Sequence, residues 1–480
     1  MAQDNRSLLQ ALDEAPVSFF HMRAAVTAGM GFFTDAYDLF IIGMALVYLK
    51  PEWHLTAGQI GILGSGSLLA AFLGALTLGR LADLIGRKTI YGLEAALMAI
   101  GALACAFAPD FTWLLVFRFI LGFGIGGDYP MSAVLMSEYS NAKQRGSLVS
   151  LVFGMQGLGL VFGPVVALTL EAAGISHDII WRIMLGLGAI PPLAVLYLRR
   201  TMPESPRYKA LVRGQSEAAA RDMASYSEGQ IPSTGQSAGS RLPGGPLRPR
   251  TTTLRAFLGN RRNLLMILGT AGSWFLLDYA FYGNVISTPQ IIGLLAPHAS
   301  RLQGTAWALV IFAVAAVPGY LASILLMDRI GHRRLQMIGF AVMAISFGVI
   351  ALVPDMTHDV LPFLFLYGVS FFFTEFGPNC TTFVIPAEVF PTGGRTTGHG
   401  IAAGIGKLGA FAGTFLFPYI SRAGGLKGAM MFAAGVSLLG LLLTQMTLPE
   451  TSGQTLEALS AEADEEPMDD PRLVRTGASR

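Results

Sequence analysis

Hydrophobic residues fill long stretches of this chain, and short polar segments separate those stretches. Twelve stretches contain about 20 apolar residues or more, the length that a helix needs to cross ~30 Å of hydrocarbon. They lie at residues 24–49, 58–79, 89–108, 111–136, 147–173, 179–199, 263–288, 303–327, 335–354, 361–389, 397–421 and 426–447. The stretches lack the alternation of barrel strands and are too long for them, so the pattern predicts an all-α membrane protein with 12 transmembrane helices.

A polar segment divides the twelve stretches into six and six. It begins RRTMPESPRYKALVRG and continues as a Ser/Gly/Pro-rich sequence that ends PGGPLRPR, a composition typical of a linker. The chain turns polar again after its last apolar stretch. We therefore expect an N-terminal six-helix bundle at 1–200, a cytosolic linker at 201–262, a C-terminal six-helix bundle at 263–449 and a cytosolic tail at 450–480.

Composition agrees with a protein that lies in the bilayer. Charged residues make up 13% of the 480 residues, half of the roughly 25% in soluble proteins. The net charge of +2 gives no sign of a nucleic-acid partner, and the two cysteines, Cys105 and Cys380, lie in apolar stretches. The polar, acidic start is not a cleavable signal peptide. We expect no metal, no cofactor and, without a catalytic triad or nucleotide loop, no enzymatic activity.

Basic residues predict the orientation in the membrane. They collect in the connections after the second and fourth stretches, at Arg80, Arg87, Lys88, Lys143 and Arg145, and in the central linker. The connections APDF and PDMTHD carry none. By the positive-inside rule both termini face the cytoplasm. The Ala/Gly/Leu/Arg-rich chain favours a plasma membrane, specifically a bacterial inner membrane.

The two halves repeat each other. GALTLGRLADLIGRK at Gly74 matches GYLASILLMDRIGHR at Gly319, 245 residues later, and Glu138 and Arg145 return 250 residues later as Glu388 and Arg395. The DxxGRK loop resembles the recurring cytosolic signature of the major facilitator superfamily, which implies two six-helix pseudo-repeats around a central site. The charged residues of these loops are expected to form a gate between helices: Asp83, Arg87, Glu138, Arg145, Asp328, Arg333, Glu388 and Arg395.

Polar residues inside the apolar stretches are candidates for function, because a charge at the bilayer centre costs ~2.5–3.5 kcal/mol. They are Asp35, Asp38, Glu94, Arg118, Asp128, Gln156, Trp274, Asp278, Tyr282, Glu375, Asn379 and Lys407, together with Tyr129. Arg118 is expected to pair with a carboxylate of the first stretch. The neighbouring glycines Gly122, Gly124, Gly126 and Gly127 indicate close helix packing rather than nucleotide binding.

The repeat and the polarity select the same residues for a central cavity. Asp35 and Asp278 both stand in F-x-x-D, and Asn379 is the repeat mate of Tyr129. Neutral donors and one cation, Lys407, suit a small oxyanion. Asp278 would accept a hydrogen bond from a proton of H₂PO₄⁻, whereas sulfate has no proton to offer. The proton affinity of Asp278 would then be linked to the affinity for the substrate.

Several motifs resemble those of the phosphate:H⁺ symporters of fungi and plants. They are GGDYPMSAVLMSEYSNAKQRG (126–146), GFFTDAYDLF (31–40), WFLLDYAFY (274–282), GPNCTTFVIPAEVFPT (377–392) and HGIAAGIGKLGA (399–410), and the resemblance covers essentially every span. It implies that Tyr129, Gln156, Trp274, Asp278, Tyr282, Asn379 and Lys407 bind inorganic phosphate, and that Asp35, Asp38 and Asp128 carry protons. Glu94, buried in the same way, is a further candidate relay.

Glu375 departs from that family, which usually has a neutral residue at this place. The carboxylate could change proton coupling or pair with Lys407. We expect a monomeric proton-coupled phosphate importer whose halves rock around the central site. Two alternatives remain open: a proton-coupled transporter of a sugar or organic ion with the same fold, and a phosphate sensor.

Overall fold

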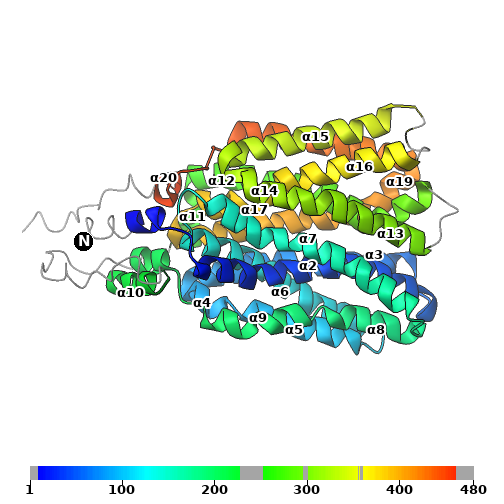
Figure 1. The fold of residues 1–480 in the computed structure, drawn as a ribbon, viewed down its shortest axis with the longest axis horizontal. Helices are drawn as coiled ribbons and strands as arrows, with labels where there is room; N and C mark the ends of the chain where they lie inside the picture. Colours follow the sequence, from blue (N-terminus) through cyan, green and yellow to red (C-terminus); the bar gives the residue numbers. More distant parts are fainter. Residues whose placement is uncertain (1–8, 227–251, 296–300, 355, 357–359, 461–480) are drawn as a thin grey trace, which may run out of the picture.

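The structure is a computed structural model, and it describes residues 9–226, 252–295, 301–354, 356 and 360–460. Every regular element in these ranges is a helix. Twelve helical spans in the described ranges are long and apolar enough to cross a membrane, which confirms the predicted number. Figure 1 shows them lying side by side along the long axis of the molecule.

The first six spans come from eight helices. They are α2 (Phe19–Glu52), α3 (Ala57–Ile85), α4 and α5 (Arg87–Ile90 and Leu93–Ala106), α6 (Phe111–Tyr139), α7 (Arg145–Ala172), and α8 with α9 (His177–Leu187 and Ile190–Thr201). Side-chain hydrogen bonds cap the N-termini of several of these helices. Thr56 and Gln59 form a capping box at the start of α3, and Asp110 accepts a 3.0 Å hydrogen bond from the amide of Trp113 at the start of α6.

The second six spans contain more breaks in helix geometry. They are α12 (Arg261–Leu295), α13 with η2 and α14 (Arg301–Ile311, Phe312–Ala316 and Val317–Ile330), α15 (His332–Leu352), α16 with η3, α17 and α18 (Val360–Thr374, Glu375–Asn379, Cys380–Val384 and Pro386–Val389), and two spans in α19 (Arg395–Thr447) after the short η4 (Thr392–Gly394). Gly425, at φ 63°, separates the last two spans, which the sequence predicts as separate helices.

Shorter helices gather at one end of the bundle, which we call the linker end (left in Figure 1). They are η1 (Tyr208–Val212), α10 (Ser216–Tyr226), α11 (Leu254–Gly259) and α20 (Leu456–Ser460). Parts of the predicted linker and tail are therefore helical. Residues 227–251 and 461–480 of those two segments lie outside the described ranges.

Glycines set the distance between neighbouring helices. A Cβ added to Gly126 of α6 would lie 2.0 Å from the carbonyl oxygen of Ala71 in α3, and one on Gly122 would lie 2.2 Å from that of Ser67. Only a hydrogen fits at such positions, so the two backbones lie in direct contact. This confirms the packing role expected for these glycines.

The two halves also meet through glycine. A Cβ on Gly79 of α3 would lie 2.7 Å from the carbonyl oxygen of Thr396, and one on Gly400 of α19 would lie 2.4 Å from that of Ala75. On the other side of the bundle, α7 packs against α14 where Gly157 faces the ring of Tyr320. The halves therefore meet both where α3 packs against α19 and where α7 packs against α14.

Candidate substrate-binding and proton-coupling site

Lys407 of α19 is the cation of the central cluster. Its ammonium nitrogen lies 3.8 Å from a carboxylate oxygen of Asp35 in α2 and 3.8 Å from one of Asp278 in α12. It donates a hydrogen bond to the hydroxyl of Tyr282 and lies 4.3 Å from the ring centroids of both Tyr129 and Tyr282. One ammonium therefore stands between two carboxylates that come from opposite halves of the molecule.

Neutral donors surround this charged group. The Tyr129 hydroxyl donates to Asp35 at 2.5 Å, and the Gln156 amide donates to Asp35 at 3.0 Å and to the Tyr129 oxygen at 3.2 Å. The hydroxyls of Tyr129 and Tyr282 lie 3.4 Å apart. The ring of Trp274 lies 5.8 Å from that of Tyr129 and closes the cluster on one side.

All seven residues predicted to bind substrate meet in one place. Each of them is at most 2% exposed: Tyr129, Gln156, Trp274, Asp278, Tyr282, Asn379 and Lys407. Asn379 joins through Tyr320, to which it donates at 2.9 Å, and Tyr320 donates to Gln156 at 3.0 Å. The cluster can offer amide, hydroxyl and ammonium donors to an oxyanion, with two carboxylates to receive protons.

Of the four predicted proton carriers, only Asp35 lies in this cluster. Asp38 forms a two-pronged ion pair with Arg118, at 3.0 and 3.2 Å, as expected for Arg118. Asp128 forms a similar pair with Arg199, at 2.7 and 3.0 Å, and Glu94 lies 3.2 Å from the same guanidinium. These three acids are therefore paired inside the N-terminal half, and their role in proton transfer stays a prediction.

Seven of the eight predicted gate residues form two matching clusters at the linker end. In the first, Arg87 lies 3.3 Å from Asp83 and 3.2 Å from Glu138, and Arg395 of the other half lies 3.0 Å from Glu138. In the second, His332 lies 3.1 Å from Asp328 and 3.0 Å from Glu388, and Arg145 of the other half lies 3.7 Å from Glu388.

Each cluster also receives a helix start from the opposite half. Asp83 accepts a 2.7 Å hydrogen bond from the amide of Thr397 at the start of α19. Asp328 accepts bonds of 3.0 and 2.8 Å from the amides of Gly146 and Ser147 at the start of α7. Carboxylates are favourable at helix N-termini, so these contacts stabilise the closed linker end.

Arg333 is the exception among the gate residues. Its guanidinium donates at 2.6 Å to the carbonyl of Gln445 in α19. His332, not Arg333, occupies the place that Arg87 has in the first half. The repeat alignment already pairs Arg87 with His332, so the signal is in the sequence.

Further residues tie the linker end together. Asp13 accepts from Arg145 at 3.3 Å and from Arg207 of the linker at 2.6 Å, and Arg207 also pairs with Glu457 of α20. Burial raises the pKa of the Glu457 carboxyl, but the charge and hydrogen bond of Arg207, together with Arg395 and a backbone hydrogen bond, leave that pKa below its ordinary value. Asp13, Arg207 and Glu457 lie in the polar start, linker and tail of the chain, and the sequence shows no periodic pattern there that would predict their pairing.

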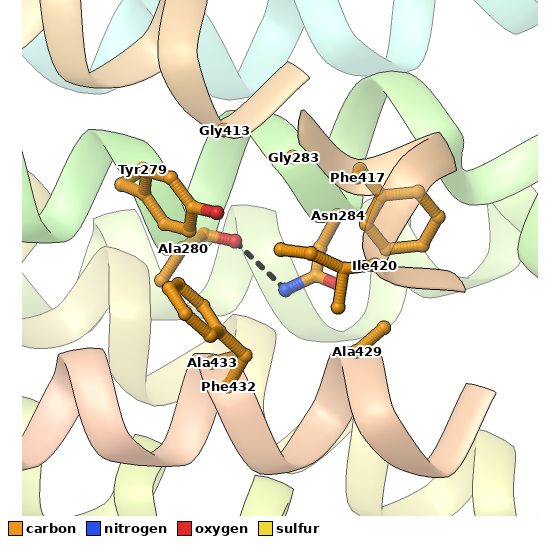
Figure 2. Close-up of a pocket in the computed structure, with 10 residues that line it drawn as sticks. All are labelled: Tyr279, Ala280, Gly283, Asn284, Gly413, Phe417, Ile420, Ala429, Phe432 and Ala433. Atoms are coloured by element: carbon orange, nitrogen blue, oxygen red, sulfur yellow. Dashed lines mark hydrogen bonds between the residues drawn. The ribbon is translucent and has the colours of Figure 1, made fainter. Parts of the chain in front are cut away.

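A small hollow lies elsewhere in the C-terminal half (Figure 2). Its lining comes from α12 and α19: Tyr279, Ala280, Gly283, Asn284, Gly413, Phe417, Ile420, Ala429, Phe432 and Ala433. The Asn284 amide donates to the Ala280 carbonyl at 2.7 Å, drawn as the dashed line. No residue of the central cluster lines this hollow. Among the described residues no group of His, Cys, Asp and Glu is arranged to hold a metal ion.

Comparison with known proteins agrees with this architecture. Residues 24–463 match the pattern described as sugar (and other) transporter. The chain belongs to this family. Its fold is that of the major facilitator superfamily: a solved structure of the proton:xylose symporter XylE with 6-bromo-6-deoxy-D-glucose bound superposes with a TM-score of 0.79, covering 93% of this chain and 99% of that one at 20% sequence identity.

Within the family, the chain is similar to proteins named for phosphate. The probable inorganic phosphate transporter 1-6 of Arabidopsis thaliana is 38% identical, over 98% of this chain and 99% of the relative. The inorganic phosphate transporter 1-6 of Oryza sativa subsp. japonica is 36% identical, and the low affinity inorganic phosphate transporter 3 of Petunia hybrida is 37% identical, each over 96% of both chains.

Proposed function

We propose that the protein is a secondary active transporter that imports inorganic phosphate together with protons by alternating access. The observation that carries this proposal is Lys407 between Asp35 and Asp278, within a shell of neutral donors. The ammonium and the donors suit the oxyanion, and the carboxylates suit the protons that H₂PO₄⁻ carries. The names of the plant relatives support phosphate as the substrate.

Charge balance explains how protons and phosphate are coupled. With both carboxylates ionised, the cluster of Asp35, Asp278 and Lys407 carries one net negative charge, which repels an anion. A proton on either carboxylate removes that charge and frees Lys407 to face phosphate. Proton binding and phosphate binding then favour each other, which is the linkage that a symporter needs.

Rocking of the bundle at 1–200 against that at 263–449 would expose this cluster to each side in turn. In the proposed orientation the linker at 201–262, the tail at 450–480 and both termini face the cytoplasm, and the two gate clusters close that side. The protein would act as a monomer in the plasma membrane, a bacterial inner membrane on compositional grounds. The membrane potential offers roughly 2.3 kcal/mol per charge per 100 mV for uphill import.

Uptake of labelled phosphate into proteoliposomes tests the proposal. We expect uptake that rises when the outside is made acidic, that collapses with a protonophore, and that unlabelled phosphate competes away while sulfate, sugars and organic acids do not. Competition by a sugar or an organic ion would identify a different substrate on the same fold. Saturable phosphate binding without net uptake would identify a sensor.

A further inference from the structure

Glu375 is a carboxyl group in the middle of a membrane span that the proposed cycle does not yet use. It begins η3, a stretch of wide, π-type helix that also contains Pro378, and its side chain is completely buried. Single wide turns of this kind are frequent at functional sites. One of its oxygens accepts from the Asn379 amide at 2.5 Å, and the other oxygen, Oε1, has no hydrogen-bond partner among the described residues.

A chain of hydrogen bonds leads from Glu375 to the central cluster. Asn379, which donates to Glu375, also donates to the Tyr320 hydroxyl at 2.9 Å, and Tyr320 donates to Gln156 at 3.0 Å. Gln156 in turn donates to Asp35 at 3.0 Å. The bond from Tyr320 to Gln156 joins the two halves of the molecule, so rocking of the halves must break or remake it.

The charges around Glu375 favour its neutral form in this closed state. Lys407 already stands between Asp35 and Asp278, and no Lys or Arg in the described ranges forms an ion pair with Glu375. The titratable groups that face it are Asp278 and Tyr282 of α12, Tyr320 of α14 and Cys380 of α17. On α15, the contact with η3 runs through Gly339 and the Leu335 carbonyl. An ionised Glu375 would be a buried charge without a cation, which is strongly unfavourable in the membrane interior.

We infer that Glu375 is an additional proton-carrying group of the transport cycle, so that one more proton accompanies each phosphate than Asp35 and Asp278 alone would move. The proton binds the Glu375 carboxylate from the outer side while the site is open there. The proton leaves to cytoplasmic water when the halves rock and the hydrogen bond between Tyr320 and Gln156 opens. The O–H bond of the Glu375 carboxyl group is the only covalent bond that forms and breaks. The inference rests on the proposed phosphate symport.

The test is the number of protons moved per phosphate, measured in proteoliposomes as the membrane potential at which net phosphate flux stops at a fixed pH and phosphate gradient. Glu375→Gln keeps an oxygen that can accept from Asn379 but cannot titrate, and we expect it to move one proton fewer per phosphate while exchange of labelled for unlabelled phosphate continues. Glu375→Asp, which still titrates, should keep the wild-type number, as should the exposed control Glu217→Gln.

A second readout covers a variant that binds phosphate but does not complete the cycle. Purified protein in weakly buffered detergent, with a pH indicator, reports protons taken up when inorganic phosphate is added, and Glu375→Gln should take up fewer than the wild type. An unchanged proton number in Glu375→Gln by either method overturns the inference while leaving phosphate symport intact. Absence of phosphate-dependent flux in the wild type removes the proposed function, and the inference with it.

Discussion

At the scale of single residues, the central cluster is defined by an imbalance between charges. Lys407 is shared by Asp35 and Asp278 at equal distances of 3.8 Å, and neither carboxylate forms the short, two-pronged contact that Asp38 makes with Arg118. Loose sharing leaves the ammonium free to turn towards an incoming anion. A tight pair would have to be broken first, at a cost of several kcal/mol for buried groups.

The first prediction concerns Asp278. Asp278→Asn removes the carboxyl group that α12 contributes to the cluster but preserves the size of the side chain. We therefore expect proton-driven phosphate uptake to fall by at least about 100-fold, as when a buried partner worth about 3 kcal/mol is lost. Uptake of labelled phosphate at pH 5.5 and pH 7.5 measures it. Asp178→Asn, at the exposed start of α8, is the matched control and should transport normally. Near-normal uptake by Asp278→Asn at pH 7.5 would contradict the coupling scheme.

Sequence alone identified the members of the cluster but not all of their partners. Offsets between the halves predicted Asp278, Tyr129 and Asn379, because a cavity on a pseudo-symmetry axis takes matching positions from both repeats. Arg199 was missed as the partner of Asp128, since an arginine at the end of a span normally turns outwards to water. Tyr320, which links Asn379 to Gln156, was also not predicted. In an apolar stretch a tyrosine counts as an aromatic core residue, so the pattern does not reveal that its hydroxyl bonds to other polar groups.

At the scale of helices, backbone contact between α3 and α6 positions part of the site. Gly126 touches Ala71, and it lies only three residues before Tyr129, so the depth of this contact sets where the Tyr129 hydroxyl meets Asp35. The same contact leaves no room for a methyl group. Helix packing and site geometry thus both depend on the contact between Gly126 and Ala71.

The second prediction follows from that contact. Gly126→Ala places a methyl carbon 2.0 Å from the Ala71 carbonyl oxygen, so α6 must move away from α3, and such overpacking costs about 1–3 kcal/mol. We expect a lower midpoint of thermal unfolding in detergent and weaker phosphate binding. Gly43→Ala in α2, where an added Cβ meets nothing within 4 Å, is the control and should lower neither, because alanine favours the helix more than glycine does. Equal midpoints for the two variants would show that α6 is not held by this contact.

Apolar length predicted the spans well, because the bilayer imposes one thickness on every helix that crosses it. The breaks inside the spans were not predicted. The wide turns at Phe312–Ala316 and Glu375–Asn379 depend on how neighbouring helices fill the space beside them, and no local pattern encodes that. The helices α10, α11 and α20 are short, and their folding depends on contacts at the linker end, such as the ion pair between Arg207 and Glu457.

At the scale of the whole molecule, the linker end is held shut by two clusters related by the pseudo-repeat. Each cluster combines a glutamate with a basic residue of the same half and an arginine of the opposite half. The glutamate is Glu138 or Glu388, and its basic neighbour is Arg87 or His332. The arginine contacts, Arg395 to Glu138 and Arg145 to Glu388, join the halves. Opening must break both, together with the amide contacts to Asp83 and Asp328.

The third prediction concerns this closure. The double variant Glu138→Gln with Glu388→Gln weakens both clusters, so we expect the halves to separate more often at the linker end. Spin labels at the exposed positions Lys143 and Arg334, one on each half, report the distance between the halves by double electron–electron resonance after the native cysteines are replaced. The distance distribution should gain a longer component. Glu217→Gln in α10 is the control, and an unchanged distribution in the double variant would contradict a gating role for the clusters.

The glycine contact between the halves has a consequence for the speed of transport. Where α3 meets α19, Gly79 and Gly400 bring the two backbones together without side chains between them. At these two positions no side chain has to rearrange when the bundles move, although Phe72 and Leu76 of α3 border the same surface near Gly404. We therefore expect the breaking of ion pairs and the movement of protons, rather than repacking between Gly79 and Gly400, to set the turnover rate.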